Sequence, residues 1–217
     1  MTDDASRPGA SPAQRVARAR QDAGLSKMAL AERILNARFG DELVSHKTYV
    51  IASDGDLMEG VSQEAIALAG HLKLGRLVVL WDDNGISIDG KVTPWFIDDT
   101  QARFKAYGWQ VIAVDGHDVQ AVSRAIATAQ GSADKPTLIA CKTHIGQGSP
   151  NRANTAKAHG EPLGAEEIKL TREALGWTHE PFVIPAEVYD LWNAKASGQR
   201  HEAAWQQQFE IGRASGR

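Results

Sequence analysis

The stretch TYVIASDG, residues 48–55, decides the fold of this chain. Its first five residues are β-branched or apolar, which is typical of a strand buried on both faces, and SDG then ends the strand in a sharp turn. Residues 57–69 follow with helical spacing, and a second apolar run, LVVLW at 77–81, leads into the polar turn DDNG. A strand, a helix and a strand this close in sequence form a right-handed βαβ unit. Asp54 and Asn84 are therefore predicted to lie just past the carboxyl ends of two parallel strands.

The rest of the chain continues the alternation of strands and helices. We predict an α/β fold with a doubly wound, mainly parallel sheet and helices on both faces. A long segment rich in Gly and Pro, residues 143–164, interrupts the pattern, and a loop of this length in a compact domain is usually functional or disordered. The further strands are predicted at 109–114 and 136–142, and the further helices at 27–39, 99–107, 119–130, 166–175, 185–196 and 203–209.

Composition excludes several classes of partner. The chain has 217 residues and a formal net charge of −3, with acidic and basic residues mixed along it, so neither nucleic acid nor an anionic membrane is expected as a partner. Cys141 is the single cysteine, which suits a reducing compartment. The first residues are acidic where a signal peptide is basic, and no apolar run is long enough to span a bilayer. We therefore expect a cytoplasmic protein.

The two polar turns carry the candidate chemistry. Asp54 offers a carboxylate oxygen, Asn84 offers an amide oxygen, and the turn after Asn84 offers a backbone carbonyl. These hard oxygen ligands suit Mg²⁺ or Ca²⁺ and not zinc. Gly55 leaves backbone N–H groups accessible to a phosphate. The pattern indicates a divalent metal that holds a diphosphate, although any βαβ sheet also uses Asp, Gly and Asn in such turns for conformational reasons alone.

Four sequence segments identify a family. They are DGDLMEGVS at 54–62, DDNGISIDG at 82–90, CKT with IG at 141–146, and HG with PLG at 159–164. The Asp-Gly pair, followed 30 positions later by Asn, matches the thiamine diphosphate motif. From about residue 28 to about residue 195 the chain resembles transketolase. The resemblance implies the thiamine diphosphate-binding fold, of the type called the PP domain.

The resemblance also implies a role for each candidate residue. The metal ligands are Asp54, Asn84 and the carbonyl of Ile86, the cofactor-binding residues are Gly55, Asn84 and His159, and the catalytic residue is His159. A lone His in a loop is more often a surface residue, but the Gly-rich loop and the resemblance together favour the functional interpretation. The implied cofactors are thiamine diphosphate and Mg²⁺, with Ca²⁺ able to substitute. The implied reaction transfers a two-carbon ketol unit from a ketose phosphate to an aldose phosphate, in the pentose phosphate pathway.

The chain also departs from the family pattern. It begins roughly a hundred residues later than the family does and ends before the family's pyrimidine-binding domain, so we expect a domain truncated at both ends. Residues 1–26 are predicted to be disordered or a non-native extension, residues 27–197 the incomplete thiamine diphosphate-binding domain, and residues 198–217 a C-terminal helical tail. We expect no turnover by the isolated chain, a pyrimidine-binding partner chain, and a homodimer if the protein is intact.

Two smaller departures lie in the first turn. Ser53 replaces the usual first Gly of the motif, and Asp56 adds a second acid next to the expected diphosphate, so both are expected to weaken cofactor affinity. His117, in an Asp-Gly turn, is predicted to be structural.

Two other functions remain open at this stage. One is a non-catalytic remnant or a subunit that only binds a partner, since lost segments would leave apolar faces exposed. The other is a different thiamine diphosphate enzyme, such as a 1-deoxyxylulose-5-phosphate synthase or a subunit of a two-component oxo-acid dehydrogenase.

Overall fold

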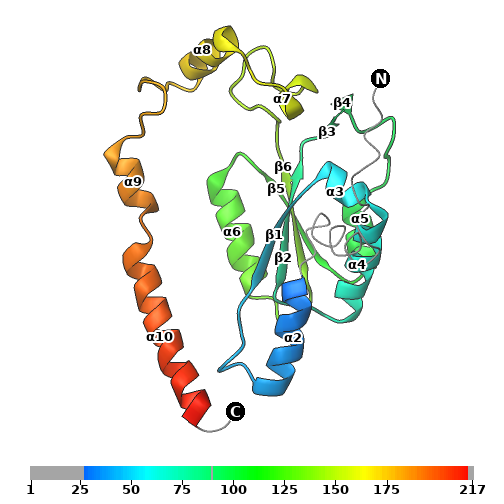
Figure 1. Ribbon diagram of the computed structural model, residues 1–217. Coiled ribbons are helices and arrows are strands. Elements are labelled where there is room, and N and C mark those ends of the chain that lie inside the picture. The colour runs from blue at the N-terminus through cyan, green and yellow to red at the C-terminus, as the bar shows by residue number, and fades with distance from the viewer. Residues whose placement is uncertain (1–26, 89, 215–217) are drawn as a thin grey trace, which may run out of the picture.

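Four parallel strands form the sheet of this protein, in the order β1-β2-β6-β5 (Figure 1). The computed structural model describes residues 27–88 and 90–214, so the prediction for residues 1–26 lies outside the described residues. The strands of this sheet are β1 Thr48–Ser53, β2 Leu77–Asp83, β5 Gln110–Asp115 and β6 Thr137–Lys142. A separate antiparallel pair consists of β3 Ile86–Ser87 and β4 Gly90–Lys91.

In the described chain, α2 precedes the sheet, further helices lie between its strands, and the last helices follow β6. Their bounds are α2 Lys27–Phe39, α3 Asp54–Met58, α4 Gly60–His71, α5 Thr100–Ala106, α6 Val119–Gln130, α7 Lys157–Gly160, α8 Ala165–Ala174, α9 Ala186–Trp192 and α10 Lys195–Ala214. The predicted helices at 27–39 and 119–130 agree with α2 and α6. The single helix predicted at 57–69 is wrong, because the chain forms α3 and α4 with an extended residue, Glu59, between them.

The register of the sheet aligns the ends of the strands. Ser53 at the end of β1 lies opposite Asp82 in β2, and Asp82 lies opposite Cys141 in β6. Because all four strands are parallel, the residues that follow them meet at one edge of the sheet. This carboxyl edge holds the candidate site.

Alternate residues of β2 divide the core between the two faces of the sheet, as a period of two requires. One cluster packs against α2, α3, α4 and α5, and the other packs against α6 (Figure 1). The first contains Val50, Ala52, Leu57, Ile66, Leu77, Val79, Trp81, Phe104, Trp109 and Leu138, and the second contains Val78, Ala125, Ala129, Ile139 and Cys141. The connection from β5 back to the interior strand β6 places α6 on the face opposite α4, which is doubly wound topology. The predicted fold class is confirmed.

The end of α4 passes very close to the turn before β5. A Cβ atom on Gly70 would lie 1.9 Å from the backbone oxygen of Tyr107. Next to this contact, the ring of Trp109 packs edge-on against Phe104 with centroids 4.9 Å apart, and its Nε1 donates to the carbonyl of Ile66 at 2.9 Å. Only glycine therefore fits at position 70.

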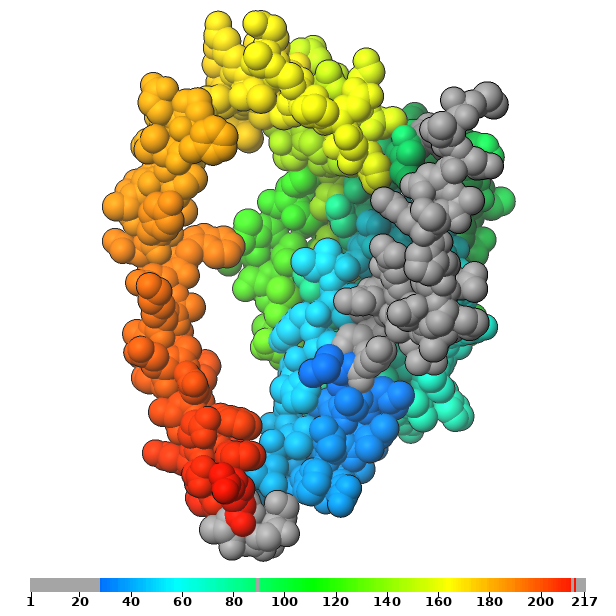
Figure 2. All heavy atoms as spheres, viewed as in Figure 1, coloured from blue at the N-terminus to red at the C-terminus, as the bar shows by residue number. Residues whose placement is uncertain are grey.

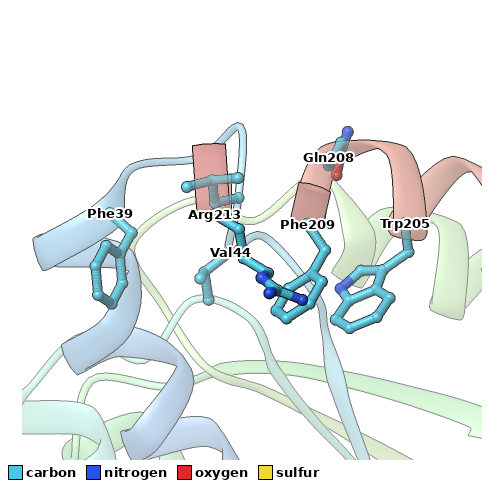
Figure 3. A pocket seen from close by; sticks show the side chains of 7 residues that line it. Phe39, Val44, Trp205, Gln208, Phe209 and Arg213 are labelled. Atoms are coloured by element: carbon cyan, nitrogen blue, oxygen red, sulfur yellow. The ribbon is translucent and has the colours of Figure 1, made fainter. Parts of the chain in front are cut away.

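The helices α8, α9 and α10, with the residues that connect them, form an arm that spans residues 165–214. Figure 2 shows that the arm stands away from the sheet over most of its length, and α10 then returns to the end of α2. There Phe39 and Val44 line an apolar pocket together with Trp205, Phe209 and Arg213 of α10 (Figure 3). The proposed boundary between residues 197 and 198 falls within α10 and stays a prediction. Of the helices described, none combines the length and the hydropathy that crossing a membrane requires.

Candidate active site

Asp54 joins the carboxyl ends of β1 and β2. It is the first residue of α3, directly after β1, and only 6% of its surface is exposed. Its Oδ1 accepts a hydrogen bond from Trp81 Nε1 at 3.1 Å, and its Oδ2 accepts one from the backbone N–H of Gly85 at 2.7 Å. The first polar turn and the second therefore meet through this single carboxylate.

The environment of Asp54 makes its negative charge costly. Burial is the main cause that raises the pKa of the carboxyl above its ordinary value, and the nearby Asp83 carboxylate raises it further. The hydrogen bonds from Gly85 and Trp81 and the charge of Lys142 oppose this rise only in part. A divalent cation at this carboxylate would offset the cost of burying it, so the position fits a metal ligand.

Asn84 is oriented by its own turn. Its Oδ1 accepts the backbone N–H of Ile86 at 2.9 Å, and its Nδ2 donates to Asp82 Oδ2 at 3.2 Å. Gly85, between Asn84 and Ile86, has φ +71°, a conformation that residues with a side chain disfavour. Its carbonyl accepts the N–H of Val92 at 3.1 Å. The turn is thus fixed from both sides, and it brings the predicted ligands Asn84 and Ile86 next to Asp54.

The donor set of this site is mixed. Among residues 27–88 and 90–214, no three His, Cys, Asp or Glu side chains gather in a way that could hold a metal. A site at the two turns would depend on one carboxylate, one amide oxygen and one backbone carbonyl, supplied by Asp54, Asn84 and Ile86. Such a set suits a hard cation that keeps further positions for a phosphate.

The first turn is closed by a capping box. Asp56 Oδ2 accepts from the backbone N–H of Ser53 at 2.7 Å and from Ser53 Oγ at 2.8 Å, while the Asp56 N–H points back to Ser53 Oγ at 3.5 Å. The two departures from the family motif are therefore partners in one local structure. Next to them, a Cβ on Gly55 would have only Ser53 Oγ within 4 Å, at 3.9 Å, so the space beside Gly55 is open.

Four polar residues to which the sequence analysis assigned no role connect β2 to β6. Asp82 accepts a hydrogen bond from Thr143 Oγ1, and Asp83 Oδ1 lies 3.2 Å from Lys142 Nζ. The register places Asp82 and Asp83 opposite Cys141 and Lys142, so strand pairing was the signal that would have found them. These contacts fix the point at which residues 143–164 leave the sheet.

His117 and His144 form a second contact at the start of that segment. The backbone N–H of His144 donates to Nε2 of His117 at 2.9 Å, and the two rings stack with centroids 5.4 Å apart. The backbone N–H of His117 donates to Asp115 Oδ1 at 2.9 Å. This geometry agrees with a structural role for His117, in which it holds the start of the segment through His144.

His159 lies on α7, beyond the carboxyl edge of the sheet (Figure 1). The side chain is exposed, and within the described part of the chain no hydrogen bond joins it to Asp54 or Asn84. The structure therefore brings Asp54, Asn84, Ile86 and Gly55 together, and it leaves His159 as a separate group on the segment that leaves β6.

Known proteins show the same domain. The family model described as transketolase, thiamine diphosphate binding domain, matches residues 21–214. The chain belongs to the transketolase family. The predicted resemblance is thereby confirmed, and with it the assignment of the chain to the family's thiamine diphosphate-binding domain.

Individual transketolases support this membership. Transketolase 1 of Vibrio cholerae is 56% identical and transketolase 1 of Escherichia coli is 54% identical, each over 186 residues, or 84% of this chain. The chain spans 28% of the length of these curated relatives. Transketolase from Campylobacter jejuni superposes with a TM-score of 0.81 at 34% identity, over 88% of this chain and 30% of that one. Pichia stipitis transketolase in complex with sedoheptulose-7-phosphate gives 0.81 at 39% identity, over 89% and 29%.

Proposed function

We propose that this chain binds thiamine diphosphate through a Mg²⁺ ion held by Asp54, Asn84 and the carbonyl of Ile86, with Ca²⁺ able to substitute. The observation that carries the proposal is the hydrogen bond between Asp54 and Gly85, because it holds the two motif turns together at the carboxyl edge. The buried carboxylate and the oriented amide of Asn84 supply the hard oxygens that such an ion prefers.

Other residues of the turn serve the organic part of the ligand. Gly55 leaves the space beside it free for a diphosphate, because it has no side chain to fill it. His159 provides an imidazole that donates to the ligand or holds a proton next to it. When bound, thiamine diphosphate supplies the nucleophilic carbon and the electron sink, and the protein supplies position and charge.

The proposed reaction is the transfer of a two-carbon ketol unit from a ketose phosphate to an aldose phosphate, as in the pentose phosphate pathway. Related Pichia stipitis structures contain sedoheptulose-7-phosphate, xylulose-5-phosphate and fructose-6-phosphate, and all three are ketose phosphates. Their similarity to this chain supports sugar phosphates as substrates here. We place the reaction in the cytoplasm, where the free, buried thiol of Cys141 would stay reduced.

Turnover is proposed to require more than this chain. The resemblance assigns no residue of this chain to the aminopyrimidine ring, so we propose a pyrimidine-binding partner chain and a homodimer of the complete assembly. Exposed apolar side chains on the arm favour such contacts, since Phe182 is 103% exposed, Leu191 84% and Trp192 85%. The same surface would serve a chain that binds a partner without catalysing the reaction.

Two measurements separate these functions. Calorimetric titration with thiamine diphosphate and Mg²⁺ tests the site itself, and absence of binding favours the non-catalytic chain. An assay with a ketose phosphate and an aldose phosphate then compares two samples. One is the chain alone, and the other is the chain mixed with the part of transketolase 1 from Vibrio cholerae that this chain does not match. We expect transfer only in the mixture, and sustained transfer by the chain alone would contradict the need for a partner.

A further inference from the structure

The segment that carries His159 is tied to the helix that follows it. Glu167 lies in the first turn of α8, and only 8% of its surface is exposed. Its carboxylate accepts three hydrogen bonds, from Ser149 Oγ, from the backbone N–H of Asn151 at 2.8 Å and from Asn151 Nδ2 at 2.9 Å. One buried carboxylate thus closes the segment 149–167 into a loop.

Contacts inside this loop extend the constraint to His159. Arg152 follows Asn151 and forms an ion pair with Glu161, 3.0 Å apart, so the pair reaches across α7 to the second residue after His159. The backbone N–H of Asn154 donates to the carbonyl of Ile145 at 3.0 Å. These two contacts tie the residues on both sides of α7 to the segment that begins at Asn151.

The base of the loop packs closely against its neighbours. A Cβ on Gly146 would lie 3.0 Å from the Cβ of Ala158, the residue before His159. A Cβ on Gly148 would lie 2.5 Å from a methyl carbon of Leu175 at the end of α8. Such contacts leave the loop little freedom as long as its anchor on α8 holds.

We infer that Glu167 is a positioning residue, whose carboxylate holds segment 149–161, and with it His159, in the one conformation that serves the bound cofactor. The inference rests on the proposed function, because it is the role of His159 that gives this position its value. The hydrogen bonds from Ser149 and then from Asn151 also lower the pKa of Glu167, so the charged, accepting form is the one that the fold favours.

The chain offers a matched control in the same helical turn. Glu166 is exposed, and no hydrogen bond or ion pair of its side chain occurs among the described residues. Glu166→Gln and Glu167→Gln remove the same charge from the same helix end, so both lose the same interaction with the helix dipole. Only Glu167→Gln disturbs the three hydrogen bonds of the loop.

The first experiment uses the full chain without cofactor. Amide hydrogen exchange of residues 149–161 and the Hε1 NMR signal of His159, assigned by its loss in His159→Ala, are compared between the two variants. We expect exchange in Glu167→Gln to be about tenfold faster or more, since hydrogen bonds to a buried charge are among the strong ones, together with a shifted His159 signal. Glu166→Gln should match the wild type. Equal exchange in the two variants would overturn the inference.

The second experiment measures the dissociation constant of thiamine diphosphate with Mg²⁺ by calorimetry. We expect Glu167→Gln to bind about tenfold more weakly, and the double variant with His159→Ala to bind no more weakly than His159→Ala alone. Unchanged affinity in Glu167→Gln, with weaker binding by His159→Ala, would overturn the positioning of His159 and leave the proposed function standing.

Two further outcomes keep the test decisive. If the wild-type chain binds no cofactor, the proposed function fails, and with it the claim that Glu167 positions His159 for the cofactor. The hydrogen-exchange experiment then still shows whether Glu167 anchors the loop. If Glu167→Gln does not fold, Asn151→Ala replaces it, because that change removes only the bond from Nδ2 and keeps the backbone donor. Faster exchange confined to residues 149–161 in Asn151→Ala would support the inference, and unchanged exchange would overturn it.

Discussion

The Oδ2 atom of Asp54 lies 2.7 Å from the backbone nitrogen of Gly85, although 31 positions separate the two residues in the chain. The contact exists because β1 and β2 are parallel and in register, so the residues after them meet at one edge. This hydrogen bond links the two turns directly, so we expect a change in one turn to affect the other. The metal site proposed between them should therefore respond as a unit.

Replacing Asp54 by Asn should abolish cofactor binding that depends on Mg²⁺. The amide keeps the size of the side chain but loses the charge that attracts the cation. In the wild type, thiamine diphosphate at a hundred times its dissociation constant should add about 2.7 kcal/mol of stability and raise the melting temperature by about 2–4 °C. In Asp54→Asn, thermal unfolding with and without the two ligands should coincide. The control Asp134→Asn removes a charge just before β6, at the opposite end of the sheet, and should keep the shift.

The Ser53–Asp56 capping box should show strong coupling between its two members. Ser53→Ala and Asp56→Ala should each destabilise the chain by about 1 kcal/mol, because each removes hydrogen bonds that satisfy the first turn of α3. Since both variants break the same structure, the double variant should lose clearly less than the sum of the two. Thermal unfolding of the four proteins measures this cycle, and additive losses would mean that the two side chains act independently.

Local patterns were enough to predict the sheet and the edge at which its two polar turns meet. The strand at 48–52 and the turn after it could be read from β-branched residues followed by Asp-Gly, and parallel pairing then placed Asp54 beside the turn at Asn84. This step needs no long-range information, because a short βαβ connection has one favoured hand. The roles of His159 and Ile86 came only from the resemblance and stay predictions.

Features that depend on tertiary contacts could not be predicted in this way. The interruption at Glu59 arises because its backbone is extended between α3 and α4, and periodicity does not reveal it. The helix predicted at 203–209 is only the middle of α10, which runs from Lys195 to Ala214 and so continues past the apolar residues that indicated it. The anchoring of the loop by Glu167 joins residues 16 and 18 positions apart, and an acidic residue in a first helical turn gives no sign of such a contact.

Two glycines of the same helix should respond in opposite ways to substitution by Ala. Gly70→Ala should destabilise the chain by about 1–3 kcal/mol, because its Cβ would lie 1.9 Å from the backbone oxygen of Tyr107, which cannot move without disturbing the start of β5. Gly60→Ala should be neutral or stabilising by up to about 1 kcal/mol, since nothing lies within 4 Å of its Cβ position and Ala favours helix. Denaturant unfolding measures both, and equal effects would contradict the close packing at Tyr107.

The loop around His159 should lose its anchor in acid. Hydrogen bonds from Ser149 and Asn151, together with the charge of Arg152, lower the pKa of Glu167 below its ordinary value of 4.5, so the ionised carboxylate is stabilised by folding. Its contribution to stability is therefore fully present above pH 4.5 and is lost as the pH falls through the lowered pKa. The backbone amide of Asn151 donates to this carboxylate, so its NMR signal should stay constant down to pH 4.5 and move below it. In Glu167→Gln that movement should disappear, whereas in Glu166→Gln it should persist. A signal that moves equally in both variants would mean that another group controls the loop.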